Sequence, residues 1–261
     1  MTAAHPGIHP APLGGRPAAP GARLWRVVRL NVVNKWTVIW IPAMIMFFIG
    51  LVNWLIWLII WTASAPADRA DAMEGTQWSG AAFYIFVYML VVAIQIVSAT
   101  FPFALGYSVT RRDFALGSGI TFLLLAAGYA VGFTALSAIE EWTNGWGLGG
   151  HLFTSVYFAD ESIGGRLFMV FSAMLFFFAV GAFAAALFMR WRMNGILAAG
   201  AAFALLLVGT IALITFTQSW PAVGEWFVVS GPIGVTAWLL LPTVLAAVAG
   251  YAVLGRATPR S

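Results

Sequence analysis

The chain has 261 residues, of which 62% are hydrophobic and 8% are charged, and it carries 13 basic against 9 acidic residues and no cysteine. Ordinary soluble domains contain roughly 45–50% apolar and about 25% charged residues. This composition therefore excludes a soluble protein and indicates an integral membrane protein. The absence of cysteine excludes disulfides, a thiolate nucleophile and a zinc–thiolate site. The basic residues form no continuous surface, so no nucleic-acid partner is expected.

The N-terminal region divides into a tail and an amphipathic segment. Residues 1–22 are dominated by Pro, Gly and Ala without apolar periodicity, which predicts a disordered cytoplasmic tail. Residues 23–36 have helical periodicity instead. Their apolar face holds Leu24, Trp25, Val28, Val32 and Trp36, their polar face holds Arg23, Arg26, Asn31 and Asn34, and Arg29 and Lys35 lie at the borders. This pattern predicts a basic amphipathic helix in the membrane interface, with Trp25, Arg26, Arg29 and Lys35 as its interfacial residues. The alternative is a charged flank of the first membrane span.

Six long charge-free runs follow Lys35, and each holds enough apolar residues for one helix across a hydrocarbon core of about 30 Å. They predict transmembrane helices near 37–61, 82–107, 115–139, 167–189, 195–217 and 233–255. The six-span domain thus covers residues 37–255, and residues 256–261 form a cytoplasmic tail. The predicted fold class is an all-α integral membrane protein with six transmembrane helices, preceded by an amphipathic interfacial helix.

The distribution of charge predicts the orientation. With the N-terminus in the cytoplasm, every basic residue except Arg69 and Arg166 lies in a cytoplasmic segment, as the positive-inside rule requires. Both termini are therefore expected to be cytoplasmic, and the location is expected to be the plasma membrane, in a bacterium the cytoplasmic membrane. The external acidic residues Glu140, Glu141, Asp160 and Glu161 are expected to be solvated loop charges. The sequence does not specify the structure of the external loop 140–166.

Small and polar residues recur within the predicted spans. Gly128 with Gly132, and Gly181 with Ala185, have the spacing that allows two helices to approach closely, within the bundle or between subunits. Uncharged polar residues such as Thr100 and Ser137 are expected to form hydrogen bonds between helices more often than to contact a substrate.

No predicted span contains Asp, Glu, Lys, Arg or His. Proton-coupled carriers and voltage sensors depend on ionisable residues inside the membrane, so neither class fits. The sequence motifs of intramembrane metalloproteases and aspartyl proteases are missing, and His151 is expected on the opposite side of the membrane from the candidate nucleophile Ser118. The chain is therefore predicted to have no catalytic, cofactor-binding or metal-binding residues and not to be an enzyme.

The link between the second and third predicted spans carries a short motif. Residues 106–117 read Gly-Tyr-Ser-Val-Thr-Arg-Arg-Asp-Phe-Ala-Leu-Gly. A Gly-x-x-x-Thr-Arg-Arg-x-Phe-x-x-Gly segment at this position resembles the permease subunits of ABC-2-type transporters, and the resemblance extends over residues 23–255. In that family an amphipathic connecting helix precedes six spans, and short re-entrant helices often precede the sixth span, here 218–232. The link between spans two and three forms a short coupling helix that docks into a cleft of a separate ATP-hydrolysing subunit.

The resemblance implies an ATPase-coupling segment made of Thr110, Arg111, Arg112, Asp113 and Phe114. In this interpretation Arg111 and Arg112 pair with acidic groups of the partner while Phe114 fills an apolar pocket on it. The alternative is a tight loop whose arginines only fix the orientation. The chain has no P-loop motif, so ATP and Mg²⁺ would be bound by the partner subunit.

The sequence therefore predicts the permease subunit of an ATP-driven ABC transporter, an exporter by resemblance. It would work with a P-loop ATPase and with a second permease copy or a related permease. One alternative is a polytopic membrane protein without a transport role, such as an assembly, immunity or sensor component with no ATPase partner. Another is a membrane enzyme that acts on lipids. The sequence specifies neither the substrate nor whether the two permeases are identical.

Overall fold

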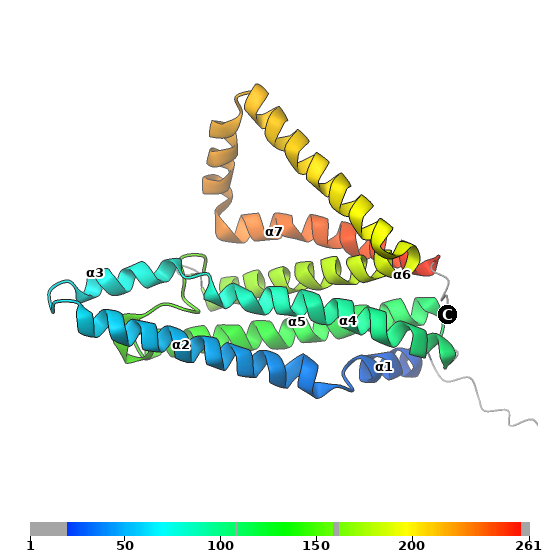
Figure 1. The fold of residues 1–261 in the computed structure, drawn as a ribbon, viewed down its shortest axis with the longest axis horizontal. Coiled ribbons are helices and arrows are strands. Elements are labelled where there is room, and N and C mark those ends of the chain that lie inside the picture. Colours follow the sequence, from blue (N-terminus) through cyan, green and yellow to red (C-terminus); the bar gives the residue numbers. More distant parts are fainter. Residues whose placement is uncertain (1–19, 108, 159–161, 257–261) are drawn as a thin grey trace, which may run out of the picture.

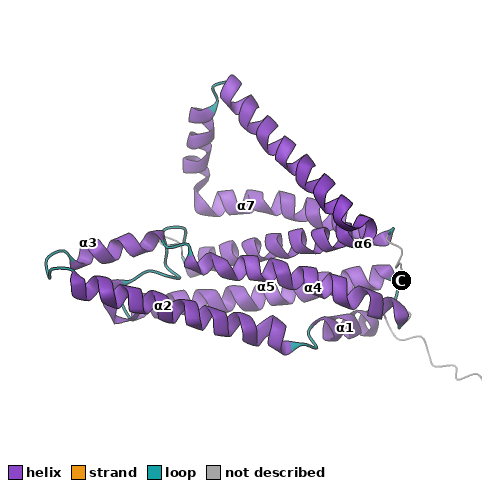
Figure 2. Ribbon diagram, in the orientation of Figure 1, coloured by secondary structure: helices purple, strands orange, loops and turns teal. Residues whose placement is uncertain are grey.

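The structure, a computed structural model, describes residues 20–107, 109–158 and 162–256 (Figure 1). The described residues form helices joined by turns, with no strand among them (Figure 2). The all-α fold class is therefore confirmed. The predicted disordered tail lies outside the described residues apart from residues 20–22, which begin the first helix. Residues 257–261 of the C-terminal tail also lie outside them.

Long helical stretches run side by side along the longest axis of the molecule (Figure 1). In chain order the elements are α1 (Pro20–Asn31), the π-helix η1 (Trp36–Trp40), α2 (Ile41–Ala63), α3 (Arg69–Glu74), the 3₁₀-helices η2 (Gly75–Trp78) and η3 (Ala81–Phe83), α4 (Tyr84–Gly106), α5 (Arg111–Trp142), η4 (Gly145–Gly149), α6 (Ile163–Phe216) and α7 (Trp220–Gly255). The bundle consists of α2, α4, α5 and the first part of α6. Its two ends are called the Arg111 end, which carries α1, and the Glu140 end, which carries α3.

Five helical segments of the described chain are long and apolar enough to cross a membrane, in agreement with a multi-pass membrane protein. They are Trp36–Ala63, Arg69–Gly106, Arg111–Trp142, Ile163–Phe216 and Trp220–Gly255. The count differs from the six predicted spans because 167–189 and 195–217 both belong to α6, which is interrupted at Arg192 (φ 57°, ψ −144°). The charges of Arg190 and Arg192 therefore mark a sharp break in one helix, not a loop.

Beyond this break, residues 193–216 leave the bundle and α7 returns to it (Figure 1). Most side chains of residues 193–216 are exposed, so this section has few protein neighbours within the described chain. The section of α7 over 220–230 is a short helix inside the segment 218–232. It ends at Gly231, whose φ of 61° and ψ of 177° lie in a region open to glycine but not to other residues. The rest of α7 runs back to the Arg111 end.

The core is built around α4. Its buried positions Phe86, Met89, Ala93, Val97 and Phe101 follow the spacing of one helix face. An added Cβ on Gly181 of α6 would lie 2.4 Å from the carbonyl oxygen of Leu90, so only glycine allows this approach of α6 to α4. The expected close contact through Gly181 and Ala185 is therefore confirmed within the bundle, because both residues are buried.

Gly128 and Gly132 behave differently. Both are exposed on α5, and an added Cβ on either would meet no atom of another residue within 4 Å. This pair therefore makes no close helix contact within the described chain, and instead it lines a cavity beside α2.

The start of the α2 span is held by two tyrosines. Pro42 has no N–H, so it cannot donate to the carbonyl oxygens of Thr37 or Val38 as a helical residue at this position would. The hydroxyl of Tyr88 donates to Thr37 O at 3.0 Å, and the hydroxyl of Tyr129 donates to Val38 O. The two hydroxyls thus replace the missing helix donor, and they fix η1 against α4 and α5.

Candidate functional site

The predicted coupling segment lies at the Arg111 end, between α4 and α5. α4 ends at Gly106 and α5 begins at Arg111, with Thr110 as the N-cap whose hydroxyl accepts a hydrogen bond from the Asp113 N–H at 3.1 Å. A polar N-cap satisfies a backbone donor that the helix itself leaves unpaired. Residues 111–114 are therefore the first turn of α5. The separate short coupling helix that the resemblance implies does not form among the described residues of the link.

Two charged residues of the segment bind other parts of the chain, and the third does not. The Arg111 Nη1 donates to the carbonyl oxygen of Gly255 at 2.9 Å, which ties the end of α7 to the start of α5. Asp113 forms an ion pair with Arg23 of α1, with 3.8 Å between the charged groups. Arg112 is exposed and makes no hydrogen bond or ion pair to a described residue. Arg112 is therefore the charged group of the segment that is open to a partner.

Phe114 does not have the expected role. Its side chain is 0% exposed, and its ring packs edge-on against Phe101 of α4 with 5.1 Å between centroids. The expectation that Phe114 fills an apolar pocket on a partner is therefore wrong for this structure. The apolar pocket that receives Phe114 belongs to the chain's own core, because the first turn of α5 is part of the bundle.

The helix α1 packs on this same region and differs from the predicted amphipathic helix. It begins at Pro20 and ends at Asn31, so Lys35 and Trp36 belong to the start of the α2 span and not to α1. Its packed face holds the buried Val27, Val28 and Asn31 and the half-buried Leu24, while Trp25 is 52% exposed and Arg26 and Arg29 are exposed. The assignment of Asn31 to the polar face was wrong, because Asn31 lies on the side of the helix that packs on α5. Positions 24, 27, 28 and 31 have the spacing of one helix face.

Gly117 allows α1 to approach α5 closely. An added Cβ on Gly117 would lie 2.5 Å from the Cβ of Val27, a distance at which something must move. This explains the last glycine of the motif in the link: α1 packs on α5 about two turns after the N-cap Thr110.

Asn31 holds α1 through three hydroxyl groups. Its Nδ2 donates to Ser118 Oγ at 3.1 Å and to Thr121 Oγ1 at 3.2 Å, and its Oδ1 accepts from Thr100 Oγ1 at 3.0 Å. Asn31 is 4% exposed. Thr100 thus forms the bond between elements that was expected of it, and Thr215 of α6 accepts from Trp220 Nε1 of α7 at 3.2 Å. Asn53, Ser98 and Thr210 bond instead to carbonyls of their own helices.

Replacing Asn31 with Ala is expected to loosen α1 from the bundle. The change leaves buried hydroxyl groups without their partner, which costs about 1–3 kcal/mol. Trypsin should therefore cleave after Arg26 and Arg29 several-fold faster in the variant than in the wild type. Asn34→Ala is the matched control, because Asn34 is exposed. Equal cleavage rates in N31A, N34A and wild type would contradict the anchoring role.

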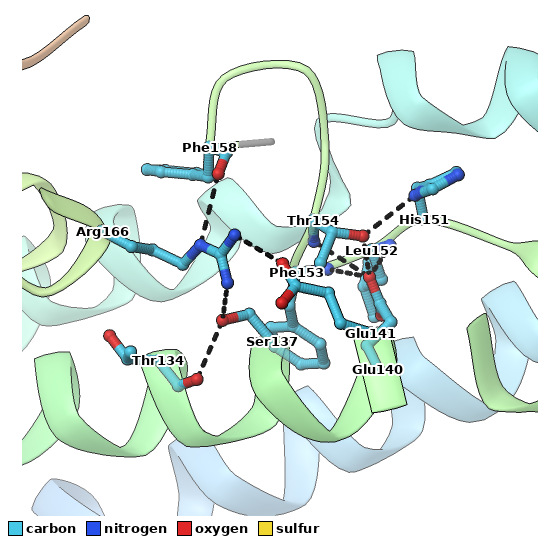
Figure 3. A network of polar contacts seen from close by, with 10 residues as sticks. All are labelled: Thr134, Ser137, Glu140, Glu141, His151, Leu152, Phe153, Thr154, Phe158 and Arg166. Atoms are coloured by element: carbon cyan, nitrogen blue, oxygen red, sulfur yellow. Dashed lines mark hydrogen bonds and ion pairs between the residues drawn. The ribbon is translucent and has the colours of Figure 1, made fainter. Parts of the chain in front are cut away.

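A second polar network closes the Glu140 end (Figure 3). Glu140 is 0% exposed, and its Oε1 accepts from the backbone N–H groups of Leu152, Phe153 and Thr154 at 2.9–3.0 Å and from the Thr154 hydroxyl at 2.6 Å. Its Oε2 accepts from Trp146 Nε1 at 3.0 Å. Successive backbone N–H groups that converge on one anion form a binding concavity. Glu140 is therefore a buried anchor and not the solvated loop charge that was expected.

Arg166, at the start of α6, holds the neighbouring part of the loop. It is 2% exposed, and its guanidinium donates to Ser137 Oγ at 2.8 Å, to Glu141 Oε1 at 2.6 Å and to the carbonyl oxygen of Phe158 at 3.2 Å. Glu141 is paired with Arg166, although half of its side chain remains exposed. Asp160 and Glu161, the other two expected loop charges, lie outside the described residues.

The loop reaches Glu140 through a tight reversal. Asn144, Gly145, Trp146, Gly147 and Gly149 all have positive φ. An added Cβ on Gly145 would lie 2.2 Å from Gly150 N, and one on Gly150 would lie 2.2 Å from the ring of Trp57. The chain therefore folds back on α2, and this reversal turns the N–H groups of residues 152–154 toward Glu140. The glycine-rich run was the signal in the sequence for this structure.

Several cavities lie along the helices of the bundle. Two apolar cavities of about 390 and 500 Å³ lie along α2, and a third of about 540 Å³ lies between α5, α6 and α7. A smaller polar cavity of about 300 Å³ lies at the Glu140 end. No group of three His, Asp or Glu side chains in the described part of the chain could hold a metal ion.

Comparison of the chain with models of protein families, with curated proteins and with solved structures gives no match. The functional interpretation therefore rests on the geometry of the two ends of the bundle, on the cavities, and on the resemblance of the link between α4 and α5.

Proposed function

We propose that this chain is the membrane-spanning permease subunit of an ABC-2-type transporter, driven by a separate P-loop ATPase that binds ATP and Mg²⁺. In this proposal it crosses the membrane six times, through α2, α4, α5, the two sections of α6 and the last section of α7. Both termini and the Arg111 end face the cytoplasm. The subunit works as an exporter in the plasma membrane, paired with a second copy or a related permease.

One observation carries the proposal: the exposed Arg112 belongs to a helix turn that is connected to two other parts of the chain. Arg111 binds the end of α7, and Asp113 binds α1 through Arg23. A partner that binds Arg112 and displaces this turn would therefore move α1, α5 and α7 together. ATP binding in the partner would shift the bundle between two arrangements, as a ligand does when it favours one of two states.

The proposed second permease would cover surfaces that this chain leaves open. The α2 span and residues 193–216 carry many exposed apolar side chains, among them Phe47, Ile59 and Phe203. Part of this surface would contact lipid and part the second permease, and the transport path would lie between the two subunits.

The proposal is tested by purifying the tagged full-length chain from its native membrane in a mild detergent and identifying the proteins that accompany it. A stoichiometric subunit with a P-loop, whose ATP hydrolysis is stimulated when the two are reconstituted together, is the expected result. If the chain purifies cleanly from its native membrane and no ATPase accompanies it, the proposal is overturned. It would favour the assembly, immunity or sensor alternative.

A further inference from the structure

Two cavities of opposite character lie one after the other along α2, toward the Glu140 end. The first, of about 500 Å³, is apolar and is lined by Phe47, Gly50, Trp54 and Trp57 among others. The second, of about 300 Å³, starts at Trp61 and is called the polar cavity because Arg69, Glu74 and His151 are among its lining residues. Trp54, Trp57 and Trp61 are three and four residues apart, so they lie on one face of α2. The loop 144–153 lies against both cavities: Trp146, Leu152 and Phe153 line the first, and Asn144, Leu148, Gly149 and His151 line the second.

The apolar cavity continues toward the middle of the bundle. A further apolar cavity of about 390 Å³ shares Ala43, Met46, Leu136 and Phe153 with it, so the two form one groove. From Pro42 to Trp57 this groove follows α2 over about 22 Å, at a rise of 1.5 Å per residue. One leaflet of the hydrocarbon core is about 15 Å thick. The groove is therefore long enough to hold one acyl chain.

The polar cavity is lined by a positively charged side chain, Arg69, that has unused hydrogen-bond donors. Arg69 donates through Nε to the carbonyl oxygen of Trp61 at 3.0 Å, and its guanidinium lies over the Trp61 ring at 3.9 Å from the centroid. Its two terminal amino groups make no hydrogen bond to a described residue, and Arg69 lines the cavity. A guanidinium fixed in this way, with planar donors remaining, matches the oxygens of a phosphate.

The same cavity offers two acceptors. Glu74 lines it and has no partner among the described residues. The single hydroxyl proton of Thr154 goes to the Glu140 carboxylate, so the contact of 2.9 Å between Thr154 Oγ1 and His151 Nδ1 requires Nδ1 to carry the donor proton. In the neutral imidazole, Nε2 is then an acceptor. Glu74 and His151 are therefore suited to a primary ammonium group.

From this charge pattern we propose that the two cavities bind one phosphatidylethanolamine molecule of the bilayer. Its phosphate pairs with Arg69, its ammonium donates to Glu74 and His151, and one acyl chain fills the groove along α2. The cavity's one positive and one negative side chain match a headgroup that carries one of each. A choline headgroup has no N–H to donate, and a phosphatidylglycerol headgroup leaves Glu74 without a cation.

The site needs no ATPase partner, so its test is independent of the proposed function. The purified full-length chain, stripped of lipid in detergent, is titrated with phosphatidylethanolamine, phosphatidylcholine or phosphatidylglycerol of identical acyl chains and examined by native mass spectrometry. The expected result is one tightly bound phosphatidylethanolamine, with an affinity about tenfold higher than for the other two lipids, or 1.4 kcal/mol. Glu74→Gln should abolish this preference, and Arg69→Gln should weaken the binding of all three.

Matched variants separate the site from general effects on the protein. Asp71→Asn removes an acid from α3 that does not line the cavity, and it should leave the preference intact. An added Cβ on Gly50 has only one neighbour, Leu152 Cδ2 at 3.9 Å, so Gly50→Phe should fill the groove and block binding. Gly209→Phe, on an exposed face of α6, should not. Equal affinity for the three headgroups, or wild-type binding in Glu74→Gln or Gly50→Phe, would overturn the proposal.

Discussion

Replacing Glu140 with Ala is expected to destabilise the protein by about 3–5 kcal/mol, because several buried donors lose their acceptor at about 1–3 kcal/mol each. The carboxylate accepts from three backbone N–H groups, one hydroxyl and one indole N–H. Its loss leaves the buried donors of residues 152–154 unpaired, and each unpaired group costs about 1–3 kcal/mol before the loop rearranges. Thermal unfolding in detergent, followed by tryptophan fluorescence, measures the change.

Two further variants sharpen this test. Glu140→Gln keeps an oxygen for the donors at Oε1 but places an amide donor opposite the Trp146 indole N–H, so it should cost less than Ala and more than a surface change. Glu225→Gln is the control, because Glu225 is exposed on α7 and such substitutions usually change stability by no more than about 0.5 kcal/mol. If Glu140→Ala and Glu225→Gln unfold at the same temperature, Glu140 does not anchor the loop.

The position of Glu140 could have been predicted from the periodicity of α5. The helix buries Ala126, Ala130, Phe133 and Ser137, and the next position on that face is Glu140. Composition alone favoured a solvated charge, since a glutamate near a helix end is usually exposed. What the periodicity does not provide is the set of donors. These come from a loop whose path depends on five residues with positive φ and on contact with Trp57 of a different helix.

The Arg111 end illustrates the same limit. The sequence correctly located a short polar link between two apolar helices, but it assigned Phe114 to a partner surface and Asn31 to the polar face of α1. Both errors come from packing within the chain: Phe114 packs on Phe101 of α4, and Asn31 lies on the side of α1 that packs on α5. Hydrophobic periodicity shows which side chains share a face, and it does not show whether lipid or another helix lies against that face. Gly117, which permits the contact, was read only as part of a motif.

Replacing Arg112 with Glu is expected to reduce the amount of copurified ATPase by about tenfold or more. Like charges that face each other across an interface cost several kcal/mol, and each 1.4 kcal/mol is a factor of ten in affinity. The variant should fold normally, because Arg112 is exposed and makes no contact with the described chain. The measurement is the molar ratio of ATPase to permease after purification, together with ATP hydrolysis by the reconstituted complex.

Arg190→Glu is the control, since Arg190 lies over the Trp191 ring at the break of α6 and not in the link. Phe114→Ala is a poor probe of the interface, because truncating a buried phenylalanine costs about 3–5 kcal/mol of stability. If Arg112→Glu retains the ATPase at the wild-type ratio, the link does not form the docking site.

The variant Arg111→Ala distinguishes two roles of the link: binding of the ATPase, and transmission of its motion to α7. The Arg111 guanidinium binds the carbonyl oxygen of Gly255 within the chain, so Arg111→Ala removes a connection between α5 and α7 without removing the exposed charge of Arg112. A complex that contains Arg111→Ala should therefore retain its ATPase and hydrolyse ATP, but stimulation of that hydrolysis by transport should fall. Loss of ATPase binding in Arg111→Ala would instead place Arg111 itself at the interface. Normal binding with normal stimulation would show that α7 follows the bundle without this bond.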